Sequence, residues 1–201
     1  MRAHYIALEG IEGAGKSSLA PMVVSLLEAA GRPALWVREP GGTVAGEAIR
    51  DILLGRQQGL EAWTEALLFA AQRAQLAAEV IGPALKAGTS VVGDRSVYSS
   101  LAYQGAGRGL GVGLVRTVNR AGLGDVWPDI VVLLQVDPGL GLERQAIPDR
   151  IGSEGVDFQR RVASAYEELA AEEADRFIVV EATGALERVA ATVVEEVLAR
   201  W

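Results

Sequence analysis

The stretch Gly10-Ile11-Glu12-Gly13-Ala14-Gly15-Lys16-Ser17 limits the possible fold more than any other part of this chain. Two glycines separated by four residues are followed directly by lysine and serine. Residues 5–8, which precede it, are apolar and predict a strand, and residues 18–27 are typical of a helix. A strand, a glycine-rich loop and a helix in this order form a phosphate-binding loop. The plain alternative is a glycine-rich turn with a chance Lys-Ser, and the strand-to-helix setting argues against it.

The chemistry of such a loop follows from its backbone. Glycines let the chain curl so that N–H groups point at phosphate oxygens, and the helix N-terminus adds roughly half a positive charge. We expect Lys16 to reach the β- and γ-phosphates and the Ser17 hydroxyl to help hold Mg²⁺. Lysine occurs elsewhere only at position 86, and a point-charge phosphate ligand is a role in which arginine does not replace it. The sequence therefore predicts an ATP or GTP site formed by Gly10, Ile11, Glu12, Gly13, Ala14, Gly15, Lys16, Ser17 and Ser18.

Composition narrows the class of protein. With 201 residues, half of them hydrophobic, the chain is long enough for one domain with a substantial core, and we expect residues 1–201 to form it. The net charge of −7 argues against sequence-independent nucleic-acid binding. No apolar run approaches the ~20 residues that span a bilayer, so no membrane partner is expected. The chain has no cysteine and no signal-peptide pattern, and a cytoplasmic location is the expectation.

The remaining elements alternate between strand and helix patterns. We expect strands at 5–8, 34–37, 89–93, 130–136 and 176–180, and helices at 18–27, 44–54, 64–85, 98–104, 113–121, 158–174 and 186–199. This alternation predicts an α/β fold with a parallel five-stranded sheet and helices on both faces. Asp137 and Pro138 are typical of a helix start, whereas residues 142–153 mix Pro, Gly and Arg and are interpreted as a mobile segment.

Two polar segments follow predicted strands at the sheet edge where open α/β folds bind ligands. The first, Arg38-Glu39-Pro40-Gly41-Gly42-Thr43, contains a chain-breaking Pro-Gly-Gly turn. The second is Asp94-Arg95, in which the planar guanidinium suits a phosphate and the carboxylate suits metal-bound water or an arginine. A surface ion pair at a strand end is the alternative for this second segment.

Helical spacing groups further candidates. Phe69 and Arg73 lie four apart and share a face that could stack on a base and bond its edge, although Phe is more often core and Arg solvated. Ser100, Tyr103 and Gln104 show the same spacing. Arg144 and Arg150 flank the Pro-containing segment and could close over a triphosphate, because phosphoryl transfer depends on positioning and electrostatics. His4, the only histidine, is expected to be structural.

Together these segments resemble the thymidylate kinase family of P-loop nucleoside monophosphate kinases. The resemblance is carried by residues 9–18, by Arg38–Thr43 with residues 46–50, by residues 68–75, and by Asp94-Arg95-Ser96 with residues 99–105. The Arg-Glu-Pro-Gly-Gly-Thr segment is the most specific, since most P-loop proteins lack it. The resemblance implies a three-layer P-loop fold, a homodimer, and transfer of phosphate from ATP to dTMP with Mg²⁺.

The same resemblance implies roles for individual positions. Phe69 stacks on thymine, Arg73 donates to its O4, and Arg95 binds the acceptor phosphate with help from Arg38. A fixed donor there rejects cytosine, by on the order of 10⁴-fold at best. The implied dTMP site comprises Glu12, Arg38, Pro40, Arg50, Phe69, Arg73, Arg95, Ser100, Tyr103 and Gln104. The metal candidates are Ser17 and Asp94, the catalytic candidates are Glu12, Lys16, Arg95, Arg144 and Arg150, and Glu39-Pro40 is the family's cis bond.

The position of Gly13 assigns the chain to a subgroup. Some family members carry an arginine inside the phosphate loop, whereas those with glycine supply it from a lid, here about residues 142–155. Arg144 and Arg150 are then the lid candidates, and the sequence leaves open which of them reaches the phosphates. Ser96 and Gly152 depart from the family pattern, which usually has an aromatic residue or histidine and a glutamate there.

Other functions stay possible at this stage. A kinase for another pyrimidine nucleotide would share these features, and a deoxynucleoside kinase would need a base for the 5′-hydroxyl, for which Glu39 is available. A P-loop ATPase switch would hydrolyse nucleotide without an acceptor. A GTPase switch should carry an Asn-Lys-x-Asp motif, and the sequence has none.

Overall fold

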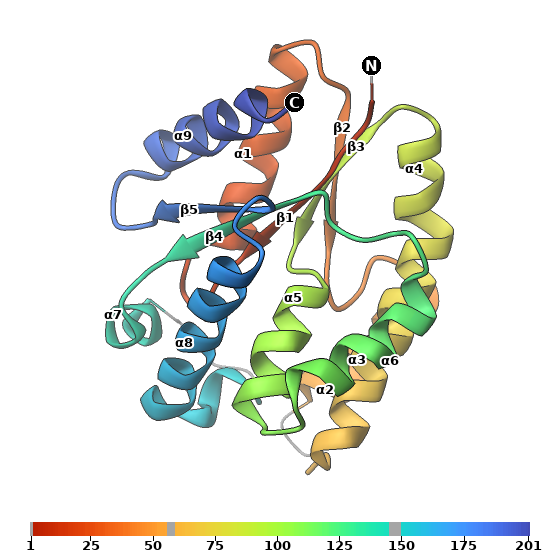
Figure 1. The fold of residues 1–201 in the computed structure, drawn as a ribbon, viewed down its shortest axis with the longest axis vertical. Helices are drawn as coiled ribbons and strands as arrows, with labels where there is room; N and C mark the ends of the chain where they lie inside the picture. The colour runs from red at the N-terminus through yellow and green to blue at the C-terminus, as the bar shows by residue number, and fades with distance from the viewer. Residues whose placement is uncertain (1, 56–58, 145–149) are drawn as a thin grey trace.

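The computed structural model describes residues 2–55, 59–144 and 150–201. Within them, five parallel strands form one sheet in the order β2-β3-β1-β4-β5 (Figure 1). The strands are β1 (Tyr5–Glu9), β2 (Ala34–Arg38), β3 (Ser90–Asp94), β4 (Ile130–Gln135) and β5 (Phe177–Glu181). Every predicted strand is present, and the predicted parallel α/β sheet is confirmed.

The helices largely follow the predicted ranges. They are α1 (Lys16–Ala29), α2 (Val44–Leu54), α3 (Ala62–Leu76), α4 (Gly82–Lys86), α5 (Val97–Ser100), α6 (Val112–Leu123), α7 (Pro138–Glu143), α8 (Val156–Glu172) and α9 (Leu186–Ala199). The predicted cap of α7 is confirmed, because the Asp137 side chain accepts from the backbone N–H groups of Gly139 and Leu140. A short 3₁₀-helix, η3 (Gly152–Glu154), precedes α8. Residues 145–149 of the segment interpreted as mobile lie outside the described residues.

Two π-helical segments depart from the prediction. The long helix expected at 64–85 is interrupted by η1 (Ala77–Ile81), which lies just before Pro83. Proline has no N–H for the ladder, so the regular bonding pattern breaks there. The helix expected at 98–104 continues as η2 (Leu101–Gly107), three residues beyond its predicted end.

Helices cover both faces of the sheet, giving three layers (Figure 1). The alternation of side chains along β4 explains how. Ile130, Val132 and Leu134 pack into a cluster with α1 and α9 on one face. Val131 and Leu133 point to the other face and pack with α5, α6 and α8. Because both faces are covered, β4 is apolar along almost its whole length, as expected for a buried parallel strand.

The strand register brings three polar segments to one edge of the sheet. Leu8 of β1 pairs with Asp94 of β3, and Asp94 in turn pairs with Arg38 of β2. The phosphate loop follows β1, so its backbone lies beside the ends of β2 and β3. All strands run in the same direction, and this edge is the carboxyl edge at which open α/β sheets bind ligands.

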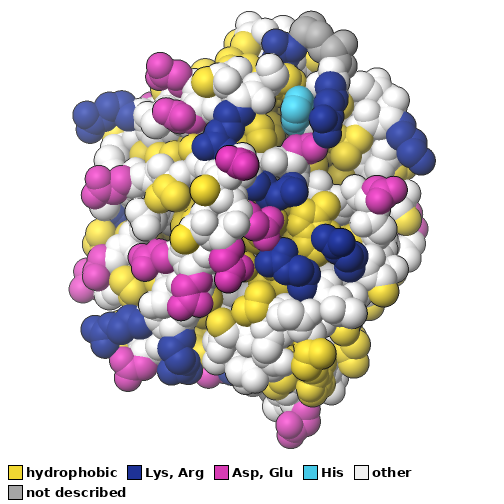
Figure 2. Space-filling model, viewed as in Figure 1, with side chains coloured by type: hydrophobic (Ala, Val, Ile, Leu, Met, Phe, Trp, Pro, Cys, Tyr) yellow, Lys and Arg dark blue, Asp and Glu magenta, His cyan; other side chains and the backbone are white. Residues whose placement is uncertain are grey.

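The surface mixes both signs of charge. Figure 2 shows acidic and basic side chains interspersed over one face, with hydrophobic side chains gathered near α3 and α6. Exposed apolar residues on these two helices are Trp63, Leu67 and Leu114. Among the described residues, no helix combines the length and apolar character needed to cross a membrane.

Candidate active site

A cavity of about 530 Å³ lies over the carboxyl edge of the sheet and contains most of the predicted site. The predicted residues that line it are Glu12, Gly13, Ala14, Gly15, Lys16, Ser17, Ser18, Arg38, Pro40, Arg50, Phe69, Asp94, Arg95, Ser100, Tyr103, Gln104 and Arg144. Four predicted residues, Gly10, Ile11, Arg73 and Arg150, do not line it. The cavity therefore joins the phosphate loop to the segments after β2 and β3, as the sequence predicted.

The phosphate loop depends on backbone conformations that favour glycine. Gly10, Gly13 and Gly15 all have positive φ angles, of 140°, 72° and 90°. A Cβ on Gly13 would collide with the backbone carbonyl of Gly141 in α7. The loop is thus packed against α7 at a position where any side chain, including the arginine of the other subgroup, has no room.

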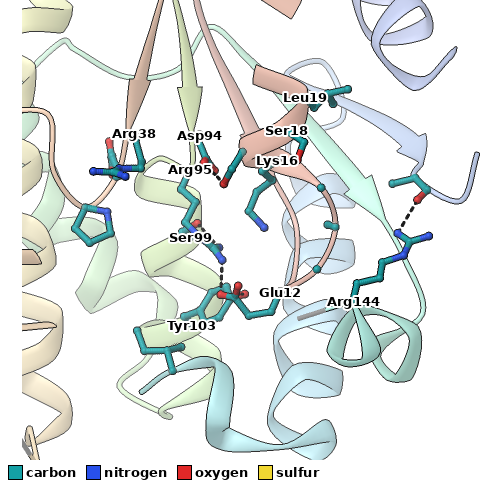
Figure 3. A pocket seen from close by; sticks show the side chains of 18 of the residues that line it. Glu12, Lys16, Ser18, Leu19, Arg38, Asp94, Arg95, Ser99, Tyr103 and Arg144 are labelled. Carbon is teal, nitrogen blue, oxygen red and sulfur yellow. Dashed lines mark hydrogen bonds and ion pairs between the residues drawn. The ribbon is translucent and has the colours of Figure 1, made fainter. Parts of the chain in front are cut away.

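Lys16 is buried at the start of α1 and points into the loop (Figure 3). Its Nζ donates to the carbonyl oxygens of Gly10, at 2.9 Å, and Ile11, at 2.7 Å. Burial, together with the nearby positive charge of Arg95, lowers the pKa of Lys16 from 10.5 to about 8. A phosphate placed in the loop would oppose both effects, because an anion favours the charged amine.

Arg95 occupies the centre of the cavity. It has a φ of 75°, a left-handed conformation that is costly for a residue with a side chain and is found mostly at functional positions. Its guanidinium forms an ion pair with Glu12, donates to Ser99 Oγ at 3.3 Å, and lies 5.1 Å from the centre of the Tyr103 ring. Figure 3 shows Arg95 reaching from the end of β3 toward the loop. A strongly basic, partly buried fork is thus held beside the phosphate loop.

Ser17 and Asp94, the two metal candidates from the sequence, lie together. The Ser17 hydroxyl donates to Asp94 Oδ2 at 2.5 Å, and both residues line the cavity. A hydroxyl and a carboxylate are hard oxygen donors, which fit Mg²⁺. In the described part of the chain, no group of three or more His, Cys, Asp or Glu side chains forms a protein-only metal site. Mg²⁺ commonly keeps waters and substrate phosphates as ligands, so a two-residue donor set fits that ion.

The segment after β2 forms a second wall. The Glu39-Pro40 bond is cis, as the resemblance implied. The Pro40 carbonyl accepts from Arg50 at 2.6 Å, and Arg38 forms a half-exposed ion pair with Glu47 at 3.4 Å. Thr43 caps α2 by accepting from the backbone N–H of Gly46. Two arginines from β2 and α2 therefore lie at the same end of the cavity.

Another wall comes from α3, α5 and η2, and α3 is bonded to the segment after β2 through Gln72 and Arg73. Phe69, Ser100, Tyr103 and Gln104 line it, so the helical spacing noted in the sequence does bring them to one place. Arg73 instead lies behind this wall and is only 2% exposed. Its direct contact with a base stays a prediction, because its side chain is engaged with protein partners.

Those partners make Arg73 the centre of a buried polar cluster. Nε donates to Glu39 at 2.6 Å, and Nη1 donates to Ser100 Oγ at 3.2 Å and to Asn119 Oδ1 at 2.6 Å. Nη2 donates to the Ser96 carbonyl at 3.1 Å. Burial raises the pKa of Glu39, and Arg73 opposes that shift. Arg73 thus fixes Ser100, which lines the cavity, from behind.

The two lid candidates lie in different places. Arg144 lines the cavity on the far side of Lys16 from Arg38 and donates to the Ala182 carbonyl at 3.0 Å (Figure 3). Arg150 lies outside the cavity lining and forms an ion pair with Glu65 at 2.7 Å. Of the two lid candidates, Arg144 is the one that lines the cavity.

Three buried carboxylates hold segments around the site together, and the sequence did not predict this role. Glu9, at the end of β1, accepts from Ser96 and Ser99 and from the Tyr166 hydroxyl. Glu39 pairs with Arg73, and Glu65 pairs with Arg108 and Arg150. The helical spacing of Glu65, four residues before Phe69, was the available signal for one of them. The departure from the family pattern at Ser96 also has a structural role. Its hydroxyl caps α5 by accepting from the backbone N–H of Tyr98, and it donates to Glu9 at 2.7 Å.

Comparison with known proteins identifies the family of this chain. The family model described as thymidylate kinase matches residues 8–193. The chain belongs to the thymidylate kinase family. Thymidylate kinase of Deinococcus radiodurans is 44% identical over 182 residues, covering 89% of this chain and 88% of that protein. Thymidylate kinases of Pelotomaculum thermopropionicum and Halothermothrix orenii are 45% and 44% identical, covering 92% and 94% of this chain and 88% and 93% of theirs.

Membership of the thymidylate kinase family agrees with the chemistry that the cavity can perform. Its walls supply a backbone cradle with a buried lysine, a central arginine, two hard oxygen donors and an aromatic ring. Such a cavity can hold two phosphorylated ligands that meet near Arg95. The acidic molecule provides this basic environment locally, through arginines drawn from β2, α2, β3 and the end of α7.

Proposed function

We propose that this protein transfers the γ-phosphate of ATP to dTMP, giving dTDP and ADP, as a cytoplasmic step of dTTP synthesis. The supporting observation is a single cavity that joins the phosphate loop to Arg95 and to a wall carrying Phe69. The family membership supports the same reaction. We treat residues 1–201 as one domain with a lid at about 142–155.

The ATP end is proposed to work through the phosphate loop. Residues 10–18 would hold the β- and γ-phosphates through backbone N–H groups, and Lys16 would exchange its carbonyl partners for phosphate oxygens. Mg²⁺ held at Ser17 and Asp94 would supply positive charge beside the phosphates. Arg144 would approach the nucleotide from the lid side, which its place in the cavity lining supports.

The dTMP end is proposed to use Arg95 and the walls formed by the segment after β2 and by α3, α5 and η2. Arg95 and Arg38 would bind the acceptor phosphate, Phe69 would stack on the base, and Tyr103 would lie against the sugar. Glu12 holds the Arg95 guanidinium and would orient it for the acceptor. A phosphate acceptor is already anionic, so the transfer requires no general base and depends on positioning.

A coupled assay of ADP formation tests this proposal. The substrates are dTMP, dUMP, dCMP, dGMP and thymidine, each with ATP and Mg²⁺. We expect dTMP to give the highest kcat/KM and ADP formation without an acceptor to be negligible. Equal ADP formation with and without dTMP would favour an ATPase switch. Preference for thymidine would favour a deoxynucleoside kinase with Glu39 as its base.

We also propose that two copies pair through α3 and α6. These helices pack on each other and carry the exposed Trp63, Leu67 and Leu114, which a pairing surface would bury. Sedimentation velocity of the wild type and of Leu114→Glu tests this. We expect a dimer that the charged variant converts to monomer, and a wild-type monomer at micromolar concentration would contradict it.

A further inference from the structure

Glu65 on α3 collects donors from three separate segments beneath the base-side wall. Its carboxylate is 1% exposed. Oε1 accepts from Gln104 Nε2 at 2.8 Å and from Arg108 Nε at 3.2 Å. Oε2 accepts from Arg108 Nη2 at 3.1 Å and from Arg150 Nη1 at 2.7 Å. One buried carboxylate therefore connects η2, α3 and the end of the lid segment.

The charge of Glu65 determines what it can do to its neighbours. Burial alone would raise its pKa, but the hydrogen bonds from Arg108, Gln104 and Arg150 more than offset this, and its pKa lies below the usual value. Glu65 is thus ionised at neutral pH. An ionised carboxylate accepts hydrogen bonds and donates none.

This property sets the orientation of the Gln104 amide. Gln104 must present its NH₂ group to Glu65, so its carbonyl Oε1 points elsewhere. Within the described residues, Oε1 has no hydrogen-bond partner, and it is not among the fully buried polar atoms left without one. Because Gln104 lines the cavity, Oε1 is the polar atom that it offers there.

We infer that Glu65 is a positioning residue that makes Gln104 a fixed hydrogen-bond acceptor and so selects the protonated N3 of thymine. This inference rests on the proposed function. Thymine carries an N3–H donor, whereas cytosine has a bare acceptor nitrogen at N3. A carbonyl oxygen fixed toward N3 accepts a hydrogen bond from thymine. With cytosine, two acceptors face each other, so no hydrogen bond forms and the two atoms repel.

Glu65→Gln should reverse the amide. Two arginine donors meet Oε2, whereas only Arg108 Nε, at 3.2 Å, meets Oε1, so the oxygen of the new amide keeps the Oε2 position and its NH₂ group takes the Oε1 position. That NH₂ group faces Gln104, which must turn its own carbonyl toward residue 65. Gln104 then presents NH₂ to the cavity, a donor that suits N3 of cytosine and opposes N3–H of thymine.

The experiment compares kcat/KM for dTMP and 5-methyl-dCMP, which share the 5-methyl group and differ at N3 and at position 4. We expect Glu65→Gln to reduce the preference for dTMP by on the order of ten- to a hundredfold. The matched control is Glu61→Gln, one helical turn earlier and exposed, which should keep the wild-type preference. Glu65→Asp, which keeps the charge, should retain more of the preference than Glu65→Gln.

A second background separates positioning from general structural support. With Gln104→Met the amide is absent, so adding Glu65→Gln should leave the preference unchanged. An equal fall in kcat/KM for both substrates, or the same loss of preference in the Gln104→Met background, would overturn the inference. A wild-type enzyme inactive on dTMP would overturn the proposed function itself, which is a separate result.

A charge-matched variant, measured in parallel, separates a loss of stability from a loss of base preference. Glu65→Gln leaves Arg108 and Arg150 without their buried anion, which is destabilising. Glu65→Gln with Arg108→Gln removes one buried cation together with the anion and keeps Arg150 at the Oε2 position, so the asymmetry that orients the amide remains. The preference for dTMP should fall in this double variant as well, and an unchanged preference in the folded protein would contradict the inference.

Discussion

The phosphate end and the base end of the cavity are built in opposite ways. At the phosphate end, consecutive residues 10–18 of one loop supply the backbone groups, and Lys16 bonds to carbonyls five and six residues before it. At the base end, single side chains from α3, η2 and α6 meet, and Arg73 bonds to partners 23 to 46 residues away. The first site is a local conformation, whereas the second exists only when the whole domain has folded.

The largest expected effect comes from the phosphate end. Lys16→Ala removes the buried cation of the loop, and we expect kcat to fall by on the order of 10³-fold while the fold is retained. Steady-state kinetics and thermal unfolding measure the two properties. The control is Lys86→Ala on α4, the exposed second lysine, which should behave as the wild type. A Lys16→Ala enzyme within tenfold of wild-type kcat would remove the proposed role of the loop.

The base end should respond in stability as well as in binding. Arg73→Ala leaves Glu39 buried without its cation, so we expect the free energy of unfolding to fall by about 3–5 kcal/mol. Selectivity against cytosine should also weaken, because Ser100 loses a donor. Urea unfolding measures the stability, with Arg160→Ala as control, since its ion pair with Asp157 is exposed. A loss below about 1 kcal/mol would show that the cluster does not depend on Arg73.

A pair of glycine variants separates contact from backbone strain at the phosphate end. Gly13 and Gly31 have nearly equal φ angles, 72° and 73°, but only Gly13 has a neighbour within 4 Å of its virtual Cβ. Gly31→Ala should cost about 1 kcal/mol of stability through strain alone and leave ATP affinity unchanged. Gly13→Ala must in addition separate the loop from α7, and we expect ATP affinity to fall about ten- to a hundredfold. Equal affinities in the two variants, measured by calorimetry, would rule out this packing constraint.

The same contrast explains what the sequence could predict. The strands, the loop and the cap at Asp137 depend on neighbours in the chain, and all were predicted correctly. Parallel strands also placed Asp94 and Arg38 at one edge. The roles of Glu9, Glu39 and Glu65 depend on partners 33 to 157 residues distant, which no local pattern encodes. The helix expected at 98–104 continues to Gly107, where Gly105 and Gly107 lie close against Val112 and Phe158, two contacts that a local pattern does not show.

The smallest effect concerns pH and again distinguishes the two ends. In the free protein the pKa of Lys16 is about 8, and bound phosphate favours its protonated form. A phosphate monoester, with a second pKa of about 6, is already fully ionised above pH 8. ATP binding there must therefore take up a proton, and its affinity should fall about tenfold from pH 7.5 to pH 9. Binding of dTMP, at the end held by arginines, should change far less.

Stability of the ligand-free protein should move in the opposite direction. The folded pKa of Lys16 is below its unfolded value of 10.5, so the unfolded chain binds more protons between pH 8 and 10.5. The contribution of Lys16 to the free energy of unfolding therefore rises with pH across that window while ATP affinity falls. Calorimetry in two buffers of different ionisation enthalpy measures the proton uptake, and Lys16→Arg, which stays charged, should abolish it. An ATP affinity that is constant from pH 7.5 to 9.5 in the wild type would mean that Lys16 does not titrate in the loop. The buried amine would then stay charged over this pH range, as the arginines of the base end do.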